Sequence, residues 1–348
     1  MSVMQCTHGW NKANACELTL PGLVFLPAGL QVAVQVVRFF EYDHFRLLKL
    51  KSLSGLKFPI KWLILRSLKI RTTKRSNMSA KKRILFIANE MSPYLELTEF
   101  SETVNKLAIK ANDNGFEVRC IMPRFGIINE RRHRLHEVVR LSGINVSIDN
   151  EDHPLQIKVA SLPNARLQVY FLDNEELFKR KYIFHDEHEK WFDDNGLRAI
   201  FFCKGALETV KKFGWPPDVI HCSGWMTGLI PCYLKTVYKK EPVFSHSKIL
   251  FTIGQNTFKE KLGQDFLKKA LIHPSLKDKD LEVFKEATNT AMFRGGANCA
   301  DAISFGAEKV EKKLIEEFSK VKGKKTLPYN AESDLTDYLQ LYGDLASK

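Results

Sequence analysis

The chain has 348 residues, of which 44% are hydrophobic and 27% are charged, an ordinary composition for a soluble globular protein with a core of normal size. Most of its net charge of +13 belongs to residues 1–77, which hold twelve Lys and Arg against three Asp and Glu and no recognisable nucleic-acid-binding module, so we expect no nucleic-acid partner. The seven cysteines include no C-x-x-C pair, which argues against a zinc site or a disulfide framework and favours a reducing, cytoplasmic compartment.

Residues 1–77 differ in composition and residue pattern from the rest of the chain. Glycine, proline and glutamine interrupt the apolar stretch 20–37, so it predicts neither a stable membrane span nor a secretory signal. Residues 39–74 alternate between basic and apolar side chains without clean helix caps, and the sequence from Met78 onward resembles an ordinary protein start. We therefore interpret residues 1–77 as a basic, poorly ordered or untranslated extension with Met78 as the initiator. A membrane-surface or targeting segment is the alternative.

From residue 83 onward, strand and helix patterns alternate. Residues 83–89 are a continuous apolar run of strand length, typical of a buried parallel strand. Apolar residues then recur at helical spacing over 100–111, and Gly115 stands where a C-cap glycine belongs. Residues 116–122 predict the next strand. These elements form a βαβ unit, whose right-handed crossover makes the two strands parallel.

The remaining elements continue this alternation. A β-meander is predicted over 144–148, 155–160 and 167–172, followed by a long loop over 173–194. Helices are predicted over 195–213, 225–238, 258–290 and 307–318, and strands over 218–221, 248–253 and 300–305. Beyond residue 322 the chain is polar, with one short helix near 335–345. We therefore predict an α/β fold, with one Rossmann-like, doubly wound parallel sheet in residues 78–322 and a polar tail over 323–348.

The chain has no Gly-x-Gly-x-x-Gly, Walker, Gly-x-Ser-x-Gly or His-Glu-x-x-His motif. Candidate functional residues must therefore be identified one by one. The stretch 218–235 predicts a strand, a glycine turn and a helix start, where α/β folds place ligands. Its His221 is by itself more often structural than catalytic, and its Trp225 more often core than ligand platform. Asp173 fits a ligand-facing carboxylate and a turn former equally well. The run Arg294-Gly295-Gly296 fits a phosphate-facing turn or, better, a helix-to-strand connection.

Several segments resemble bacterial glycogen synthases and plant starch synthases, in collinear order over about residues 83–320. The first three are the strand and loop 84–94, residues 115–126 (the family's G-H-E-V-x-V-x-x-P-R-Y) and Leu172-Asp173-Asn174 (L-D-N-P). The others are 194–207 (D-N-x-x-R-F-x-x-F-x-x-A-A-L), 217–234 (P-D-V-V-H-x-H-D-W-H-T-G-L-x-P-x-Y-L), 251–253 (F-T-I) and 294–302 (K-G-G-x-x-x-A-D). No single motif is decisive, but the joint match is specific.

Members of this family are two-domain GT-B glycosyltransferases that transfer glucose, with retention, from ADP-glucose to the non-reducing end of an α-1,4-glucan. The resemblance implies the fold of their N-terminal, glucan-binding domain, in a chain that stops before the second domain could begin. It implies no cofactor, because ADP-glucose is a co-substrate, and no metal. His221 is the catalytic candidate. The substrate-binding candidates are Glu90, Asp173, Asn174, His221, Trp225, Thr227 and Gly228; Pro123, Arg124 and Arg294-Gly295-Gly296 also match.

The chain departs from the family at the loop that faces the donor phosphates. Where the family has K-T-G-G-L, this chain has Glu96-Leu97-Thr98-Glu99-Phe100. A carboxylate at ~4 Å from a phosphate repels it by roughly 1–4 kcal/mol per charge pair, and side chains in place of glycine block a close backbone approach. Aspartate and two histidines of the family are replaced by Gly224, Met226 and Gly254. Methionine cannot donate the hydrogen bond of the histidine that lies against the reacting sugar.

Two functions fit these observations. The first is a glycogen/starch synthase-type glucosyltransferase, acting with a protein chain that completes the cleft. The second is a non-catalytic glucan- or protein-binding regulatory module derived from the synthase N-terminal domain. The altered donor loop argues against autonomous transfer, because GT-B transfer needs groups from both sides of a cleft. On either interpretation, the expected ligands are an α-glucan or a sugar nucleotide.

Overall fold

The computed structural model describes residues 17–24, 32–39, 81–163, 165–319, 321–331 and 335–347. The chain divides into two compact units, Met1–Ser79 and Ala80–Lys348. In the first unit, strands β1 (Glu17–Val24) and β2 (Val32–Phe39) pair antiparallel. The other residues of the extension, Met78 included, lie outside the described residues, so a poorly ordered segment and a start at Met78 stay predictions.

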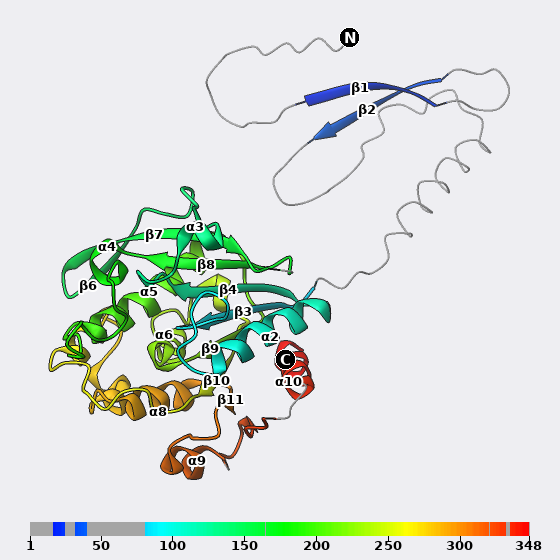
Figure 1. Ribbon diagram of the computed structural model, residues 1–348. Coiled ribbons are helices and arrows are strands. Elements are labelled where there is room, and N and C mark those ends of the chain that lie inside the picture. The colour runs from blue at the N-terminus through cyan, green and yellow to red at the C-terminus, as the bar shows by residue number, and fades with distance from the viewer. Residues whose placement is uncertain are drawn as a thin grey trace. The chain divides into compact units, whose positions relative to one another are not determined.

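The second unit is built on one sheet with the strand order β12-β11-β10-β9-β3-β4-β8-β7-β5, and β6 pairs with β7 (Figure 1). Its strands are β3 (Arg83–Ala88), β4 (Glu117–Pro123), β5 (His136–Glu137), β6 (Ile144–Ile148), β7 (Glu151–Ser161), β8 (Gln168–Asp173), β9 (Val219–Ser223), β10 (Lys248–Ile253), β11 (Ala302–Phe305) and β12 (Lys325–Leu327). Every pair from β12 to β8 is parallel, whereas β7 pairs antiparallel with β8, β6 and β5. The predicted α/β class, a doubly wound parallel sheet with a short β-meander, is confirmed, and the structure places the antiparallel meander at one edge of a mostly parallel sheet.

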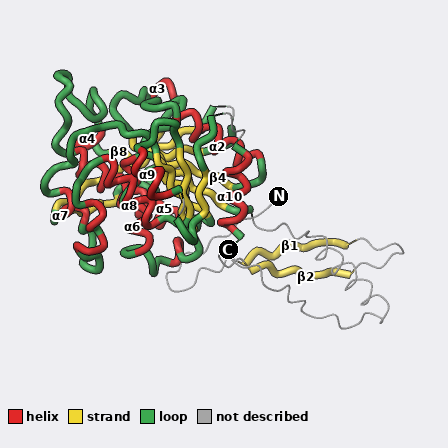
Figure 2. Tube along the Cα trace, turned by 90° about the horizontal axis from the view of Figure 1, so that it is seen from below, coloured by secondary structure: helices red, strands yellow, loops and turns green. Residues whose placement is uncertain are grey.

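Helices cover both faces of this sheet. They are α2 (Phe100–Asp113), α3 (Glu130–His133), α4 (Glu175–Phe178), α5 (Asn195–Phe213), α6 (Ile230–Lys235), α7 (Phe266–Ala270), α8 (Asn289–Cys299), α9 (Lys312–Phe318) and α10 (Thr336–Ala346). Figure 2 shows the strands between α2 and α10 on one side and α5, α6 and α8 on the other. The apolar stripe of α2 is buried, and Gly115 follows its C-cap with a φ of +90°, as its position predicted. None of the helices in the described part of the chain could cross a bilayer, since none is both long and apolar enough.

The prediction of a mostly helical stretch over 258–290 is wrong. The structure has only α7 and two 3₁₀ turns there, and α8 begins at Asn289. Gly263 has a φ of +99°, and Pro274 disfavours the helical conformation of the residue before it, so both interrupt a helix. The buried Leu276, Leu281 and Phe284 anchor an irregular segment instead. Likewise, the predicted helix 225–238 divides into a 3₁₀ turn, Trp225–Thr227, and α6.

The segment predicted as a polar tail belongs to the core of the second unit. Strand β12 extends the sheet by pairing with β11, and α10 packs against the sheet. Along α10, the residues Tyr338, Leu341, Tyr342 and Leu345 are buried, at the i, i+3, i+4, i+7 spacing of an amphipathic helix. The described domain therefore extends past the predicted boundary at residue 322, to residue 347.

Candidate functional site

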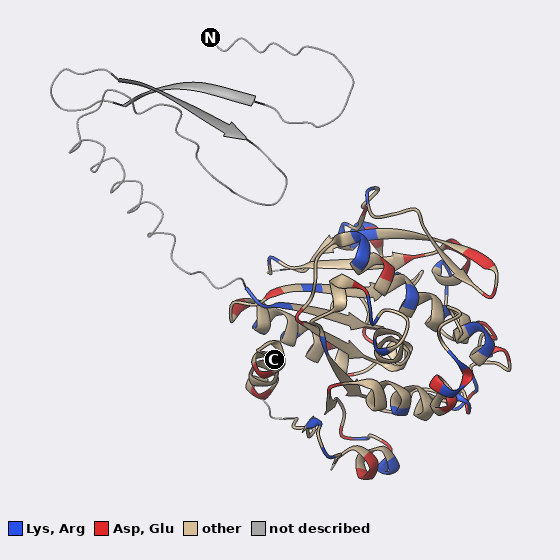
Figure 3. Ribbon diagram, turned by 180° about the vertical axis from the view of Figure 1, so that it is seen from behind, with Lys and Arg blue, Asp and Glu red and all other residues tan. Residues whose placement is uncertain are grey.

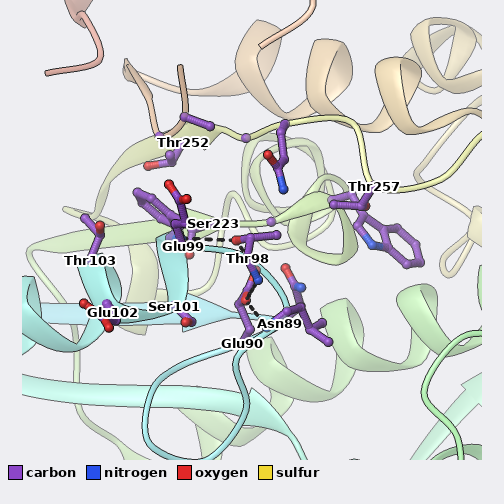
Figure 4. Close-up of a pocket in the computed structure, with 18 of the residues that line it drawn as sticks. Asn89, Glu90, Thr98, Glu99, Ser101, Glu102, Thr103, Ser223, Thr252 and Thr257 are labelled. Atoms are coloured by element: carbon purple, nitrogen blue, oxygen red, sulfur yellow. Dashed lines mark hydrogen bonds between the residues drawn. The ribbon is translucent and has the colours of Figure 1, made fainter. Parts of the chain in front are cut away.

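A pocket of about 810 Å³ opens at the carboxyl ends of the central strands (Figure 4). Asn89 and Glu90 follow β3, and Gly224 and Trp225 follow Ser223, the last residue of the adjacent strand β9. From β3 the chain proceeds through β4 to one side of the sheet, and from β9 through β10 to the other. The pocket thus lies at the topological switch point, where open α/β sheets bind ligands.

The pocket's other walls come from the loop before α2 and the first turns of that helix, from the segment after β10, and from residues that follow β11 and β12. Hydroxyl and amide groups are frequent among them: Thr98, Ser101, Thr103, Ser223, Thr252, Gln255 and Thr257. Such groups donate and accept hydrogen bonds, as a polyhydroxylated ligand requires.

Glu90 organises the loop that the sequence had singled out as altered. Its Oε2 accepts hydrogen bonds from the backbone amides of Leu97 and Thr98, both at 2.7 Å, and its Oε1 accepts one from the Thr98 hydroxyl at 2.8 Å. Burial raises the pKa of Glu90, while these hydrogen bonds pull it down. A carboxylate of the chain itself therefore occupies two loop amides that would otherwise be available to an anionic ligand.

Carboxylates outnumber cations around the pocket. The lining includes five glutamates and two lysines: Glu90, Glu96, Glu99, Glu102, Glu308, Lys106 and Lys309. Lys106 is engaged, with its Nζ 2.8 Å from Glu102 Oε2. Elsewhere in the second unit, acidic and basic residues are interspersed along the chain, as the coloured ribbon in Figure 3 shows. The excess of carboxylates makes the pocket unfavourable for a diphosphate and better suited to an uncharged ligand.

Gly224 stands where the family has aspartate, and its surroundings require glycine. Its φ of +85° and ψ of 153° place it in a region that is essentially restricted to glycine. A Cβ at this position would lie 1.3 Å from Oδ1 of Asn89. The Asn89 side chain thus fills the space into which a side chain at position 224 would project.

Trp225 lines the pocket from within an aromatic cluster. Its side chain is almost fully buried, and its ring centroid lies 5.3 Å from that of Phe184 and 4.8 Å from that of Phe258. Trp191 stacks on Phe258 at 4.6 Å and completes the cluster. Trp225 is therefore both a core residue and a pocket residue, and the cluster fixes this wall.

His221 lies beneath the pocket floor and does not line it. Its Nδ1 is 2.8 Å from the Tyr342 hydroxyl and its Nε2 is 2.6 Å from the hydroxyl of Thr252, which does line the pocket. Burial lowers the pKa of His221 to about 3, so the imidazole is neutral at physiological pH. Both ring nitrogens are engaged, which supports a structural role. Met226, at the family's second histidine, is also buried and does not line the pocket.

Asp173 and Asn174 lie at the end of β8, outside this pocket. Asp173 is buried, with its Oδ2 2.9 Å from Nζ of Lys158 and 3.8 Å from Nε of Arg124. Asn174 caps α4 by accepting hydrogen bonds from the amides of Glu176 and Leu177. Both side chains are engaged by the fold, although Asp173 Oδ1 has no hydrogen-bond partner among the described residues, and neither residue lines the pocket, so their contact with sugar stays a prediction.

Thr227 and Gly228 have packing roles as well. The Thr227 hydroxyl donates to the carbonyl of Gly224 at 2.7 Å and so closes the turn after β9. A Cβ on Gly228 would lie 2.5 Å from the carbonyl oxygen of Met292, so glycine allows α8 to approach this closely. Of the predicted substrate-binding residues, the pocket brings together Glu90 and Trp225.

Both interpretations of Arg294-Gly295-Gly296 are wrong, because all three residues lie within α8. Arg294 pairs through Nε with Glu317 at 2.9 Å. A Cβ on Gly295 would meet the ring of Phe284 at 2.1 Å, and one on Gly296 would meet the ring of Phe251 at 2.4 Å. The glycines let aromatic side chains pack against the helix.

Several pocket residues escaped the sequence interpretation, although one signal for them exists. Glu102, Thr103 and Lys106 follow the altered loop into α2 at helical spacing, so they share the helix face that lines the pocket. No comparable signal marks Asn89 or Tyr329. In the described part of the chain, no group of three or more His, Cys, Asp or Glu residues is arranged to hold a metal ion.

Comparison with known proteins places these features in context. Residues 83–326 match the family described as the starch synthase catalytic domain. The chain is similar to the glycogen synthase of Chlorobium limicola, with 34% identity over 223 residues that cover 64% of this chain and 45% of that protein. It is also similar to the glycogen synthase of Chlorobaculum parvum, with 31% identity over 275 residues that cover 72% and 55%. The chain spans about half the length of the curated relatives it matches.

A solved structure shares the fold. The catalytic domain of starch synthase IV from Arabidopsis thaliana, bound to ADP and acarbose, superposes with a TM-score of 0.58 at 16% identity. The superposition covers 74% of this chain and 53% of that domain.

Proposed function

Because the chain belongs to the starch synthase catalytic-domain family, we propose that it serves glucosyl transfer of the glycogen and starch synthase type. In the proposed reaction, glucose passes from ADP-glucose to the non-reducing end of an α-1,4-glucan with retention. One observation carries the proposal: the collinear family match builds a sheet whose main pocket lies at its switch point, between β3 and β9.

Within this reaction, the described residues hold the glucan. Hydroxyl-bearing side chains line the pocket, and carboxylates accept hydrogen bonds from sugar hydroxyls. The donor phosphates need cationic groups or free amides, and the loop at 96–99 offers glutamates and amides already bound by Glu90. We propose that groups beyond the described residues, on a protein chain that completes the cleft, bind the nucleotide.

A second candidate is a non-catalytic glucan-binding module. The observation that favours it is the same excess of carboxylates, since a pocket that repels a diphosphate still accepts a neutral glucan. Only the transferase would transfer glucose from ADP-glucose, whereas both candidates would bind glucan.

The deciding experiment measures both properties on the full-length chain purified natively, together with any protein chain that completes the cleft. Transfer is followed as incorporation of radiolabelled glucose from ADP-glucose into glycogen, and binding by titration calorimetry with maltoheptaose. Turnover supports the transferase, whereas binding without turnover supports the module. The absence of both overturns both candidates.

A pair of variants on one helix shows whether the pocket is responsible. Thr103→Trp places a large side chain at the lining of the pocket and should abolish binding and any turnover. Asp113→Trp adds the same side chain at the exposed end of α2 and should leave both unchanged. Equal behaviour of the two variants would exclude the pocket as the site.

A further inference from the structure

The main pocket continues into a smaller one of about 140 Å³. The two share five lining residues, which makes them adjoining parts of one surface: Phe100, Thr103, Lys106, Gly306 and Tyr329. The far wall of the smaller pocket is built by 327–331 together with residues of 335–338. This wall follows residue 326, where the match to the family ends.

Tyr329 stands where the two pockets meet. It is 37% exposed, one of the few large apolar side chains of the second unit with so much surface in solvent. Among the described residues, no hydrogen bond engages its hydroxyl group. An exposed aromatic ring offers an apolar face and a polar tip, a combination that matches the C–H face and the hydroxyl rim of a pyranose.

The residues around Tyr329 also suit a neutral, hydroxyl-rich ligand. Thr103 and Lys106 of α2 line both pockets, and Asn330 lines the smaller one. Because Lys106 is paired with Glu102, it adds no net positive charge that would attract a phosphate. The joint surface is longer than the main pocket alone, so it fits a chain of sugar units better than a single one.

We propose that the segments 327–331 and 335–338 build an additional α-glucan subsite, in which Tyr329 stacks on a glucosyl ring of a chain that extends from the main pocket. The proposal rests on the proposed function, since it assumes that the main pocket holds a glucan. It adds a contact that only oligosaccharides of several glucosyl units reach.

The test compares maltose and maltoheptaose by titration calorimetry on the full-length chain. Tyr329→Ala should weaken maltoheptaose binding roughly five- to tenfold, the range expected for one aromatic stacking contact, and leave maltose binding unchanged. Tyr329→Trp should retain the affinity for maltoheptaose. The control is Tyr182→Ala, which removes a tyrosine that is 39% exposed and lines neither pocket, and which should change neither affinity.

Each outcome decides a separate question. If Tyr329→Ala leaves maltoheptaose binding intact, or weakens both sugars equally, the subsite is overturned while the proposed function stands. If the unmodified chain binds neither sugar, the proposed function fails and the subsite fails with it. Thermal unfolding of each variant shows whether a loss of affinity results from a loss of stability.

Discussion

Glu90 and Thr98 are joined by two hydrogen bonds, since the carboxylate accepts from the Thr98 amide at 2.7 Å and from its hydroxyl at 2.8 Å. Residue 90 follows β3 and residue 98 precedes α2, so these bonds hold the whole loop against the end of the central strand. The loop is thereby ordered by an internal anion, and the amides are unavailable to a ligand's phosphate.

Glu90→Ala should lower the free energy of unfolding by roughly 1–3 kcal/mol, because it leaves two loop amides without their acceptor. Glu90→Gln should cost less, because the amide side chain still accepts from the backbone and donates to the Thr98 hydroxyl. Urea denaturation at neutral pH measures both. Equal losses for Ala and Gln would show that the hydrogen bonds do not stabilise the loop.

Glu90 also makes stability depend on pH. Because burial raises its pKa in the folded state, the folded chain binds more protons than the unfolded chain, and the contribution is fully present below pH 4.5. It is lost as the pH rises through the raised pKa. The unmodified chain should therefore lose stability relative to Glu90→Gln as the pH rises from 4.5 toward neutrality. Parallel profiles in denaturation at several pH values would contradict this.

Gly224→Ala should destabilise the fold by at least about 2 kcal/mol, because of its backbone conformation and the approach of Asn89 Oδ1. In the Asn89→Ala background, the same substitution should cost less, since only the backbone strain remains. A double-mutant cycle on thermal or urea unfolding measures this difference. Strict additivity would show that the two side chains do not compete for the same space.

His221 should make the fold sensitive to mild acid. Its folded pKa of about 3 lies below the unfolded value near 6.5, so its contribution is complete above pH 6.5 and is lost as the pH falls toward 3. Between pH 6.5 and 5 the loss should approach about 2 kcal/mol. His221→Gln removes the titrating group and should remove this slope, which denaturation at the two pH values measures. A slope that survives in the variant would assign it to other groups.

Asp173→Asn separates a structural role from sugar contact. Removal of the charge that faces Lys158 and Arg124 should cost roughly 1–3 kcal/mol of stability and leave the affinity for maltoheptaose within about twofold. Calorimetric titration and urea denaturation of one preparation give both values. Lost affinity at unchanged stability would restore Asp173 as a sugar contact.

The elements that the sequence predicted best are those with a strong local pattern. The bounds of α5 and β10 agree with the predicted 195–213 and 248–253. Helical spacing and apolar runs can be recognised within a short stretch of sequence. Over 258–290, the apolar spacing also satisfied a helix, but Gly263 and Pro274 made the chain irregular. The spacing of apolar residues alone does not distinguish a helix from an irregular segment whose apolar side chains are buried.

The residues of the candidate site were also predicted only in part. Glu90 was predicted from its match to the family and Trp225 from its place after a predicted strand, and both line the pocket at the switch point. His221, Asp173 and Asn174 match the family equally well, yet the structure engages them in the core or at a helix cap. Which face of a strand a side chain occupies depends on the register with its neighbours, and a motif does not contain that register.

By itself, the sequence determined the α/β class, the collinear family resemblance and the altered loop at 96–99, because each depends on residues that are close together in the chain. Only the tertiary structure decided that Tyr342 of α10 bonds to His221, that Asn89 fills the space beside Gly224, and that Tyr329 stands at the junction of two pockets. These relationships join residues far apart in sequence, and their contacts exist only once the sheet has brought the strand ends together.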